Sequence, residues 1–355
     1  MAGAGPAGLA AAIAAAGRGL DVLVLERREG PLDKACGEGL LPRAVEALDA
    51  LGALSLVDPS GRAPFGAIRW VQEDGSAAVA RLPAPGGLGV RRLALSAALL
   101  RRARALGVEV REGSEVLSHR REEGRMVVAT GTGEVAARLL VAADGLASPI
   151  RAREGLDRPA RGSRRFGLRR HFALPPWRDA VEVHFARGAE AYVTPAGPCR
   201  VGVAFLFEGE AVGGFEALLA RFPSLAARLA GAPADSRPAG AGPLARAARA
   251  RVADRLVLAG DAGGYVDAIT GEGLSLAFEG ALALGAVLPG ALACGAGREA
   301  LLPYERAVEA RFRRYAAVAR LVLGMARRPR LRRAAVARLS RHPRLFEGLV
   351  RRAVG

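Results

Sequence analysis

A run of small residues at the N-terminus constrains the fold most. Gly3, Gly5 and Gly8 form a Gly-x-Gly-x-x-Gly pattern that opens an apolar, alanine-rich segment, and residues 20–25, apolar except for Asp21, then predict a buried parallel strand that ends at Glu26. This order of turn, helix, strand and acid is typical of a dinucleotide-binding unit. The first glycine allows a tight turn, the second lets the backbone approach a pyrophosphate, and the third lets the helix pack on the strand. An ordinary glycine turn is the alternative, but it does not require the helix, strand and acid that follow.

The same unit predicts further cofactor contacts. Pro6 and Ala7 begin the helix, whose N-terminus would face the phosphates. Glu26 would accept a hydrogen bond from an adenosine ribose hydroxyl, and the neighbouring Arg27 is assigned to the same group of residues. Only Met1 and Ala2 precede Gly3, so most of the first strand is missing. Either the domain tolerates a short strand or the true start lies upstream, and we expect the second.

Two later strands are also predicted to end beside an acid. Residues 138–143 precede Asp144 and Gly145, and residues 255–259 precede Gly260 and Asp261. The carboxyl ends of parallel strands are where ligands bind in open α/β sheets. Each motif alone is also compatible with a tight turn, but their ordered combination favours one binding site. The remaining candidates for cofactor binding are Arg92, near the start of a predicted helix, and Gly271, Gly273 and Leu274, at the start of a long apolar helix.

Length and composition predict a folded protein of about two domains. The chain has 355 residues, of which 51% are hydrophobic, and single cores seldom grow far beyond about 250 residues. Its three cysteines are too few and too far apart for a disulfide framework, which favours a reducing, cytoplasmic setting. No cluster of cysteine or histidine has zinc-ligand spacing, so no metal is expected. Glu279 and Pro289 interrupt the apolar stretch over 273–297, so we expect no membrane span.

A second domain is indicated where the apolar period changes to two, between residues 166 and 207. Residues 65–82 also have the pattern of strands outside the dinucleotide unit. His171 and His184 fall on predicted strands and are expected to be structural. Residues 108–110 and 126–128 predict two strands of a β-meander.

The three glycine and acid motifs together resemble the FAD fingerprints of a flavoprotein class that includes aromatic hydroxylases and geranylgeranyl reductases. The resemblance is ordered and covers about the first 290 residues. It implies FAD as cofactor, with the first motif on its ADP moiety, Asp261 on the ribityl chain and Arg92 nearby. Asp144 and Gly145 would lie beside the pyrophosphate, where NAD(P)H also approaches in the hydroxylases. NAD(P)H or another electron donor would then be the co-substrate.

Two segments resemble the geranylgeranyl reductase branch more closely: Lys34-x-Cys36-Gly37-x-Gly39-Leu40 and Thr270-Gly271-Glu272-Gly273. The resemblance implies reduction of carbon-carbon double bonds in a small apolar, isoprenoid-like substrate by hydride transfer from reduced flavin. Cys36, or a water near Lys34 and Glu38, would supply the proton. Residues 191–195 depart from the Trp-x-Phe-Pro segment common in the reductases, so the substrate stays open. The alternatives are an NAD(P)H-dependent flavin monooxygenase acting on a small hydrophobic or aromatic substrate, and a flavin-binding module without enzymatic activity.

The expected fold is therefore α/β, with a Rossmann-like FAD-binding domain that has a parallel sheet, an inserted and mostly antiparallel β-sheet substrate domain, and a helical C-terminus. The FAD-binding domain is discontinuous. We predict the boundaries as follows: FAD-binding domain 1–60, 90–155 and 245–290; substrate domain 61–89 and 156–244, with helices over 215–229 and a linker over 231–244; basic helical region 291–355.

The C-terminal region holds most of the positive charge. The chain has 52 basic and 35 acidic residues, a net charge of +17, and residues 305–355 contribute fifteen arginines against three glutamates. Residues 328–331 recur in pattern at 342–345, each with a proline that can begin a helix. Leu331, Ala335 and Leu339 would share one helix face, and Leu345 and Leu349 another. Such basic amphipathic helices favour peripheral contact with the inner face of the membrane, and the alternative is a helical cover with solvated arginines. No nucleic-acid partner is expected, because no interleaved aromatic residues accompany the arginines.

Overall fold

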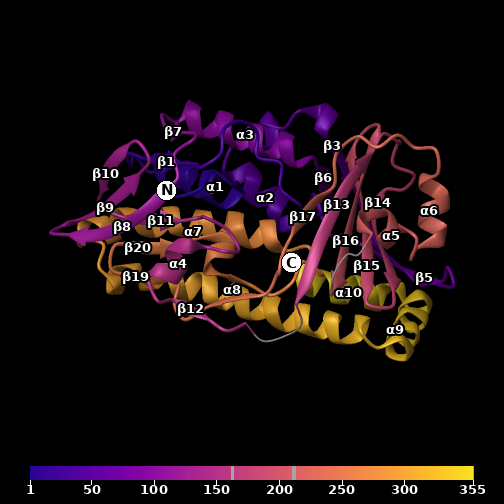
Figure 1. The fold of residues 1–355 in the computed structure, drawn as a ribbon. Coiled ribbons are helices and arrows are strands. Elements are labelled where there is room, and N and C mark those ends of the chain that lie inside the picture. Colours follow the sequence, from indigo (N-terminus) through magenta and orange to yellow (C-terminus); the bar gives the residue numbers. More distant parts are fainter. Residues whose placement is uncertain (161–163, 210–212, 355) are drawn as a thin grey trace.

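The structure, a computed structural model, describes residues 1–160, 164–209 and 213–354. A mostly parallel sheet forms the centre of its first unit, on the left in Figure 1. Ala2 makes parallel bridges to Leu25 and Ala142, so the N-terminal residues lie between two pairs of parallel strands and join them. The strands in spatial order are β7 (Glu109–Arg111), β1 (Leu23–Leu25), β11 (Leu140–Ala142), β20 (Leu256–Leu258) and the antiparallel β19 (Val252–Ala253).

Different elements cover the two faces of this sheet. One face packs against helices rich in alanine and leucine, and the other packs against a three-stranded meander. The helices are α1 (Pro6–Ala16), α2 (Pro42–Ala50), α3 (Arg92–Ala105) and α7 (Gly273–Ala293); the meander strands are β8 (Val116–Glu122), β9 (Arg125–Thr130) and β10 (Gly133–Ala137). The prediction that residues 108–110 belong to the meander is wrong. They enter β7, parallel to β1, because Val108 and Val110 pack into the helical core.

Helix α7 is long and apolar enough to cross a bilayer by length and composition alone. In this fold it packs against α1, α2 and α8 (Arg298–Ala326) and buries Phe278 and Leu284 completely. Gly285 lies against α1 so closely that a Cβ there would be 2.8 Å from the carbonyl oxygen of Ala14. These contacts are those of a core helix.

A seven-stranded sheet forms the second unit, on the right in Figure 1. All but one of its strand pairs are antiparallel, as the alternating apolar pattern predicts; the exception is the parallel pair of β4 (Ala67–Val71) and β14 (Ala180–Ala186). The spatial order is β17 (Ala239–Ala241), β13 (Arg165–Phe172), β16 (Arg200–Glu208), β15 (Ala189–Gly197), β14 (Ala180–Ala186), β4 (Ala67–Val71) and β5 (Ala77–Arg81). The expected linker over 231–244 is wrong in part, because β17 within it extends the sheet along β13. Helices α5 (Gly214–Leu219) and α6 (Pro223–Leu229) pack on one face through Phe215 and Phe222.

A small sheet connects the two units. It consists of β2 (Gly39–Leu40), β6 (Gly87–Val90) and β3 (Arg62–Phe65). A Cβ at Gly89 would lie 1.6 Å from the carbonyl oxygen of Pro195 in β15, so β6 crosses the large sheet at backbone contact distance. The loop before β2 is thereby held between the two units. In this small sheet β2, from the predicted FAD-binding segment 1–60, pairs with β6, most of which falls in the predicted substrate segment 61–89. The domain boundaries themselves stay predictions.

Three helices end the chain: α8 (Arg298–Ala326), α9 (Pro329–Arg341) and α10 (Pro343–Val354), along the bottom of Figure 1. Both predicted helix starts at proline are confirmed. The buried residues of α9 and α10 are Arg332, Val336, Leu339, Phe346 and Val350, so of the leucines on the predicted faces Leu339 is buried and Leu331, Leu345 and Leu349 are exposed. Arg332 is buried because its guanidinium donates to Gln72 and pairs with Glu73, both at 2.9 Å. That ion pair turns α9 so that Leu331 faces outward.

Candidate functional site

Three turns at the carboxyl edge of the parallel sheet meet around the start of α1. Gly3 has a φ of +104°, and a Cβ there would lie 2.6 Å from the carbonyl oxygen of Ala143, the residue before the second motif. A Cβ at Gly8 would lie 1.9 Å from the carbonyl oxygen of Gly3. A Cβ at Gly260 would lie 2.5 Å from the Cβ of Ala7, so the third turn lies on the first turn of the helix. The structure thus brings the three predicted motifs together, and only glycine fits these positions.

The backbone in front of this junction is open. A Cβ at Gly5 or Gly145 would meet nothing within 4 Å among the described residues. Pro6 is the first residue of α1, and the N–H groups of the first helical turn have no partner within the helix. A helix N-terminus behind a glycine cradle binds anions through these groups and through its partial positive charge. The residues present therefore fit the pyrophosphate of a dinucleotide.

Glu26 is buried at the end of β1, and part of its acceptor capacity holds the cradle in place. Its Oε2 accepts a hydrogen bond from the Ala4 amide at 2.7 Å, and its Oε1 accepts one from the Arg28 amide at 3.1 Å. A carboxylate has about four lone-pair sites, so acceptor positions are left for a ribose hydroxyl. Arg27 is exposed beside it. The ribose assignments of Glu26 and Arg27 stay predictions.

Charged groups cluster on the same side of the junction. Arg92 is buried, and its Nε has no hydrogen-bond partner among the described residues. Burial raises the pKa of Asp261, and the nearby charges of Arg92 and Lys34 oppose that shift. Burial also lowers the pKa of Lys34. In the second motif, Asp144 accepts the Ile150 amide through Oδ2 at 3.2 Å, while its buried Oδ1 has no partner within the described ranges. The unpaired donor on Arg92 and the unpaired acceptor on Asp144 suit a ligand that carries both acceptors and donors.

The turn before α7 completes this side. Gly271 has a φ of +72°, and Gly273 is the first residue of the helix. A Cβ at Gly273 would lie 3.3 Å from the hydroxyl of Tyr265, and Leu274 packs against the helical core. Burial raises the pKa of Glu272 to about 7. The second helix N-terminus thus presents backbone amides and an acid that is partly protonated at neutral pH.

Cys36 lies in the loop before β2. Its Sγ accepts a hydrogen bond from the Glu38 amide at 3.3 Å, and burial raises the pKa of its thiol. A Cβ at the next residue, Gly37, would meet nothing within 4 Å, so the loop faces open space there. Cys36 is therefore a protonated thiol at neutral pH. Its catalytic assignment stays a prediction.

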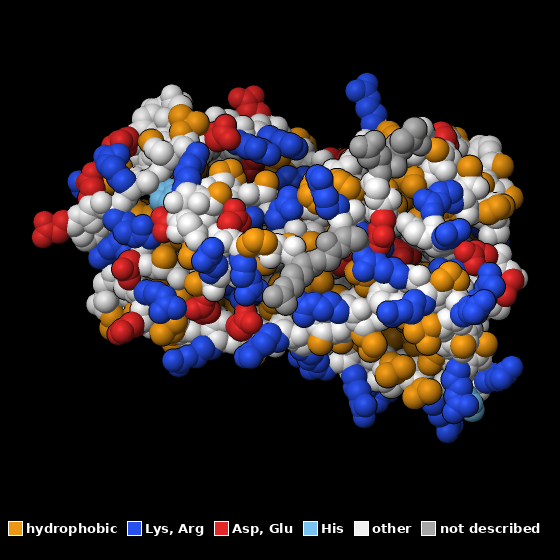
Figure 2. Space-filling view, turned by 60° about the horizontal axis from the view of Figure 1, so that its bottom comes forward, with side chains coloured by type: hydrophobic (Ala, Val, Ile, Leu, Met, Phe, Trp, Pro, Cys, Tyr) orange, Lys and Arg blue, Asp and Glu red, His pale blue; other side chains and the backbone are white. Residues whose placement is uncertain are grey.

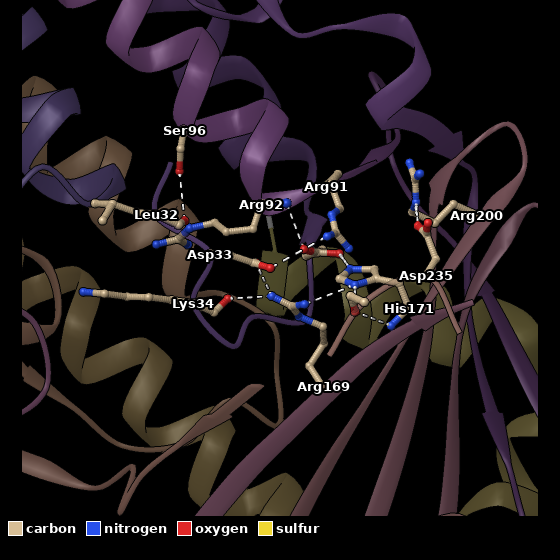
Figure 3. A network of polar contacts seen from close by, with 12 residues as sticks. Leu32, Asp33, Lys34, Arg91, Arg92, Ser96, Arg169, His171, Arg200 and Asp235 are labelled. Carbon is tan, nitrogen blue, oxygen red and sulfur yellow. Dashed lines mark hydrogen bonds and ion pairs between the residues drawn. The ribbon is translucent and has the colours of Figure 1, made fainter. Parts of the chain in front are cut away.

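A buried polar network fixes this loop to the large sheet (Figure 3). Glu38, with a φ of +60°, accepts the Arg92 amide through Oε1 at 2.8 Å. Its Oε2 lies 2.5 Å from Nε2 of His171. Arg169, two residues before His171 on β13, pairs with Asp33 and donates to the Lys34 carbonyl at 3.1 Å. Both oxygens of Glu38 are therefore engaged, an arrangement that suits positioning the Cys36 loop better than proton donation.

Sequence reasoning missed two members of this network, Arg169 and Asp33, and named His171 only as a structural residue on a predicted strand. Arg169 and His171 stand two apart on a strand and so share a face, which is the only local signal. Arginine is so common in this chain that the signal carries little weight. Burial lowers the pKa of His171, so the imidazole is neutral at neutral pH.

Comparisons with known proteins agree with this geometry. A family model described as an FAD binding domain matches residues 1–190. Menaquinone reductase of Mycobacterium tuberculosis is 37% identical over 158 residues, which cover 42% of this chain and only 37% of that relative. Digeranylgeranylglycerophospholipid reductase 1 of Methanopyrus kandleri is 30% identical over 303 residues, covering 78% of this chain and 76% of the relative. The crystal structure of p-nitrophenol 4-monooxygenase from Pseudomonas putida superposes with a TM-score of 0.83 at 19% identity, covering 98% of this chain and 95% of the other.

Proposed function

Because the chain belongs to the FAD-binding-domain family, we propose that it is an FAD-dependent oxidoreductase that reduces carbon-carbon double bonds in an apolar, isoprenoid-like substrate. The observation that carries this proposal is the protonated Cys36 thiol, held on its loop beside open space. A reductase must deliver a proton as well as a hydride, and a half-buried thiol with a raised pKa keeps that proton until a carbanion-like centre takes it. The reductase relatives support the same reaction class.

FAD, when bound and reduced, supplies the hydride that one carbon of the double bond receives. The residues of the chain would bind the cofactor, orient the substrate and supply the proton. The cradle at Gly5 and the first turn of α1 would hold the pyrophosphate. The amides from Gly271 to Leu274 would face the flavin ring, where the N-terminus of α7 stabilises negative charge without reorganisation.

Cys36 would then give its proton to the second carbon, so the π bond is replaced by two C–H bonds. The thiolate left behind regains a proton from water. The nearby Arg92 and Arg169 carry positive charge that stabilises the thiolate in the interval. Two electrons must return to the flavin in each cycle, from NAD(P)H or another donor.

A flavin monooxygenase of a small hydrophobic or aromatic substrate is the second candidate. It is supported by the likeness in fold to p-nitrophenol 4-monooxygenase and by a 35% identical stretch of 155 residues shared with an FAD-dependent monooxygenase of Arthrinium. The two candidates differ in their need for oxygen, because a monooxygenase incorporates one of its atoms and a reductase incorporates none.

The test is turnover of a polyprenyl substrate under strict anaerobiosis, with dithionite as the electron source. We expect saturated product and a loss of about a hundredfold or more in Cys36→Ser, which keeps the shape of the loop but supplies a poorer proton donor. Cys199→Ser, at an exposed cysteine, is the matched control. Product that forms only in air and contains labelled oxygen would overturn the reductase proposal. Flavin that no donor can reduce would point to a binding module without redox activity.

A further inference from the structure

The C-terminal helices expose apolar side chains that the fold does not use. Among the described residues, four of the six most exposed large apolar side chains lie on α8 to α10. Three of them, Leu331, Leu345 and Leu349, are 50%, 47% and 49% exposed, and we call them the leucine face. Leu345 and Leu349 are four residues apart and therefore share one side of α10.

Attachment of these helices to the protein does not explain the leucine face. Helix α10 packs on the large sheet through Phe346 and Val350, and the rings of Phe346 and Trp70 lie 4.7 Å apart. Helix α9 contributes Val336 and Leu339 to the same apolar cluster. A single exposed leucine needs no explanation, but three on adjoining helices are a feature of interaction surfaces.

Arginines surround the apolar surface. Figure 2 shows hydrophobic side chains gathered over the C-terminal helices with basic side chains around them. Residues 329–354 contain eight arginines and one glutamate. At the junction of α9 and α10 a hollow, which we call the arginine corner, is lined by Arg338, Arg341, His342, Pro343, Arg344 and Leu345. Its three arginines are exposed, and among the described residues none has a carboxylate within ion-pair distance.

We propose that this surface docks on an anionic lipid bilayer. Leucines beside arginines on helices that lie flat on a protein surface have the composition of interfacial helices, whose apolar side chains enter the acyl region while the cations stay among the phosphates. The charge identifies the partner, because a surface with eight arginines against one glutamate is attracted to a negative leaflet and repelled by a second copy of itself. The arginine corner would take a lipid phosphate. The cytoplasmic leaflet is the anionic one, so we also propose a cytoplasmic location at the inner face of the membrane.

The docking surface has a short connection to the candidate site. Leu41, three residues after Glu38, lies in the same apolar cluster as Phe346 and Val350 of α10. An apolar substrate that leaves the bilayer at α10 would meet the loop that carries Cys36. This last step rests on the proposed function, whereas the docking itself holds for any reaction.

Vesicle flotation of the full chain with bound FAD tests the docking. The probes are vesicles of phosphatidylcholine alone and of equal parts phosphatidylcholine and phosphatidylglycerol. We expect binding to the anionic vesicles only, weakening as salt rises. Leu345→Ser/Leu349→Ser should weaken it by about tenfold or more. Leu117→Ser, at a leucine 49% exposed on the meander, is the matched control and should bind like the parent.

A second pair of variants tests the charge. Arg341→Gln/Arg344→Gln should weaken binding by roughly 20-fold, because each arginine near an anionic surface contributes about fivefold. Arg18→Gln/Arg153→Gln removes two exposed arginines of the FAD-binding unit and should change little. Far-UV circular dichroism and retained flavin verify that each variant is folded.

Three results would overturn the proposal. One is equal binding to both kinds of vesicle; another is equal binding by the test and control variants. The third is light scattering that finds a dimer without lipid which Leu345→Ser/Leu349→Ser dissociates, since the leucine face would then bind a second copy. Loss of turnover with unchanged flotation would count against the proposed reaction and leave the docking intact.

Discussion

Replacing Glu38 with glutamine should loosen the loop that carries Cys36. The carboxylate accepts from the Arg92 amide and from Nε2 of His171, and both partners are donors. A glutamine amide has one acceptor end, so its NH2 group must face one of these two donors. The imidazole cannot switch tautomer freely, because Nδ1 already lies 3.1 Å from the Arg169 guanidinium, which donates. The substitution therefore leaves one buried donor without a partner.

The size of the effect follows from the groups that lose their partners. A hydrogen bond to a charged group contributes about 1.5–3 kcal/mol, and an unsatisfied buried donor costs about 1–3 kcal/mol. We expect Glu38→Gln to lower the free energy of unfolding by about 2–3 kcal/mol. The Glu38 amide also holds the Cys36 thiol, so a shift of the loop by about 1 Å should lower kcat by about a hundredfold. KM should change less, because no bulk is removed from the site.

Urea unfolding of the FAD-bound protein measures the first effect, and anaerobic single-turnover kinetics measure the second. Glu122→Gln is the matched control. That carboxylate also has two partners, Arg120 and Arg125, but they are exposed, so the Glu122 variant should lose far less stability than the Glu38 variant. Equal unfolding midpoints for the Glu38 and Glu122 variants, with unchanged kcat, would refute the reasoning.

Three further predictions concern pH, cofactor binding and thiol reactivity. Burial lowers the pKa of His171 in the folded protein below its ordinary value of 6.5. Between these two values the unfolded chain binds a proton that the folded chain does not, so the free energy of unfolding falls as the pH drops below about 6.5. His171→Gln should reduce this pH dependence in urea titrations from pH 7 to 5. Gly8→Ala should abolish flavin retention, because its Cβ would lie 1.9 Å from a carbonyl oxygen, whereas Gly131→Ala, with nothing within 4 Å, should retain it. At pH 8 iodoacetamide should alkylate Cys36 more slowly than the exposed Cys199, because burial raises the pKa of the Cys36 thiol; faster labelling of Cys36, followed by peptide mass spectrometry, would contradict this.

The parts of the fold that the sequence could predict are those with local signals. The glycine cradle, the first helix and the acid at Glu26 follow one another within about thirty residues, and each has its own spacing rule. The starts of α9 and α10 were predictable because proline at the first helical position is a local preference.

The parts that could not be predicted depend on distant partners. Glu38 and His171 are 133 residues apart in sequence, and no periodicity links a loop to a particular strand. The burial of Arg332 on α9 could not be predicted, because its partners Gln72 and Glu73 lie some 260 residues earlier. The sequence pattern alone predicts an exposed arginine at position 332, whereas its hydrogen-bond and ion-pair partners bury it. From the sequence, residues 108–110 could pair with either neighbouring sheet, and only the parallel pairing of β7 with β1 places them.

The crossing of Gly89 with Pro195 has a mechanical consequence. The Pro195 carbonyl oxygen occupies the space that a methyl group at position 89 would need. This close backbone packing makes the small sheet a rigid connection between the two units rather than a hinge. We therefore expect no hinged opening of the two units when a long hydrocarbon chain enters. Passage into the interior must come from rearranged side chains and short loops, and the units keep their mutual orientation while it happens.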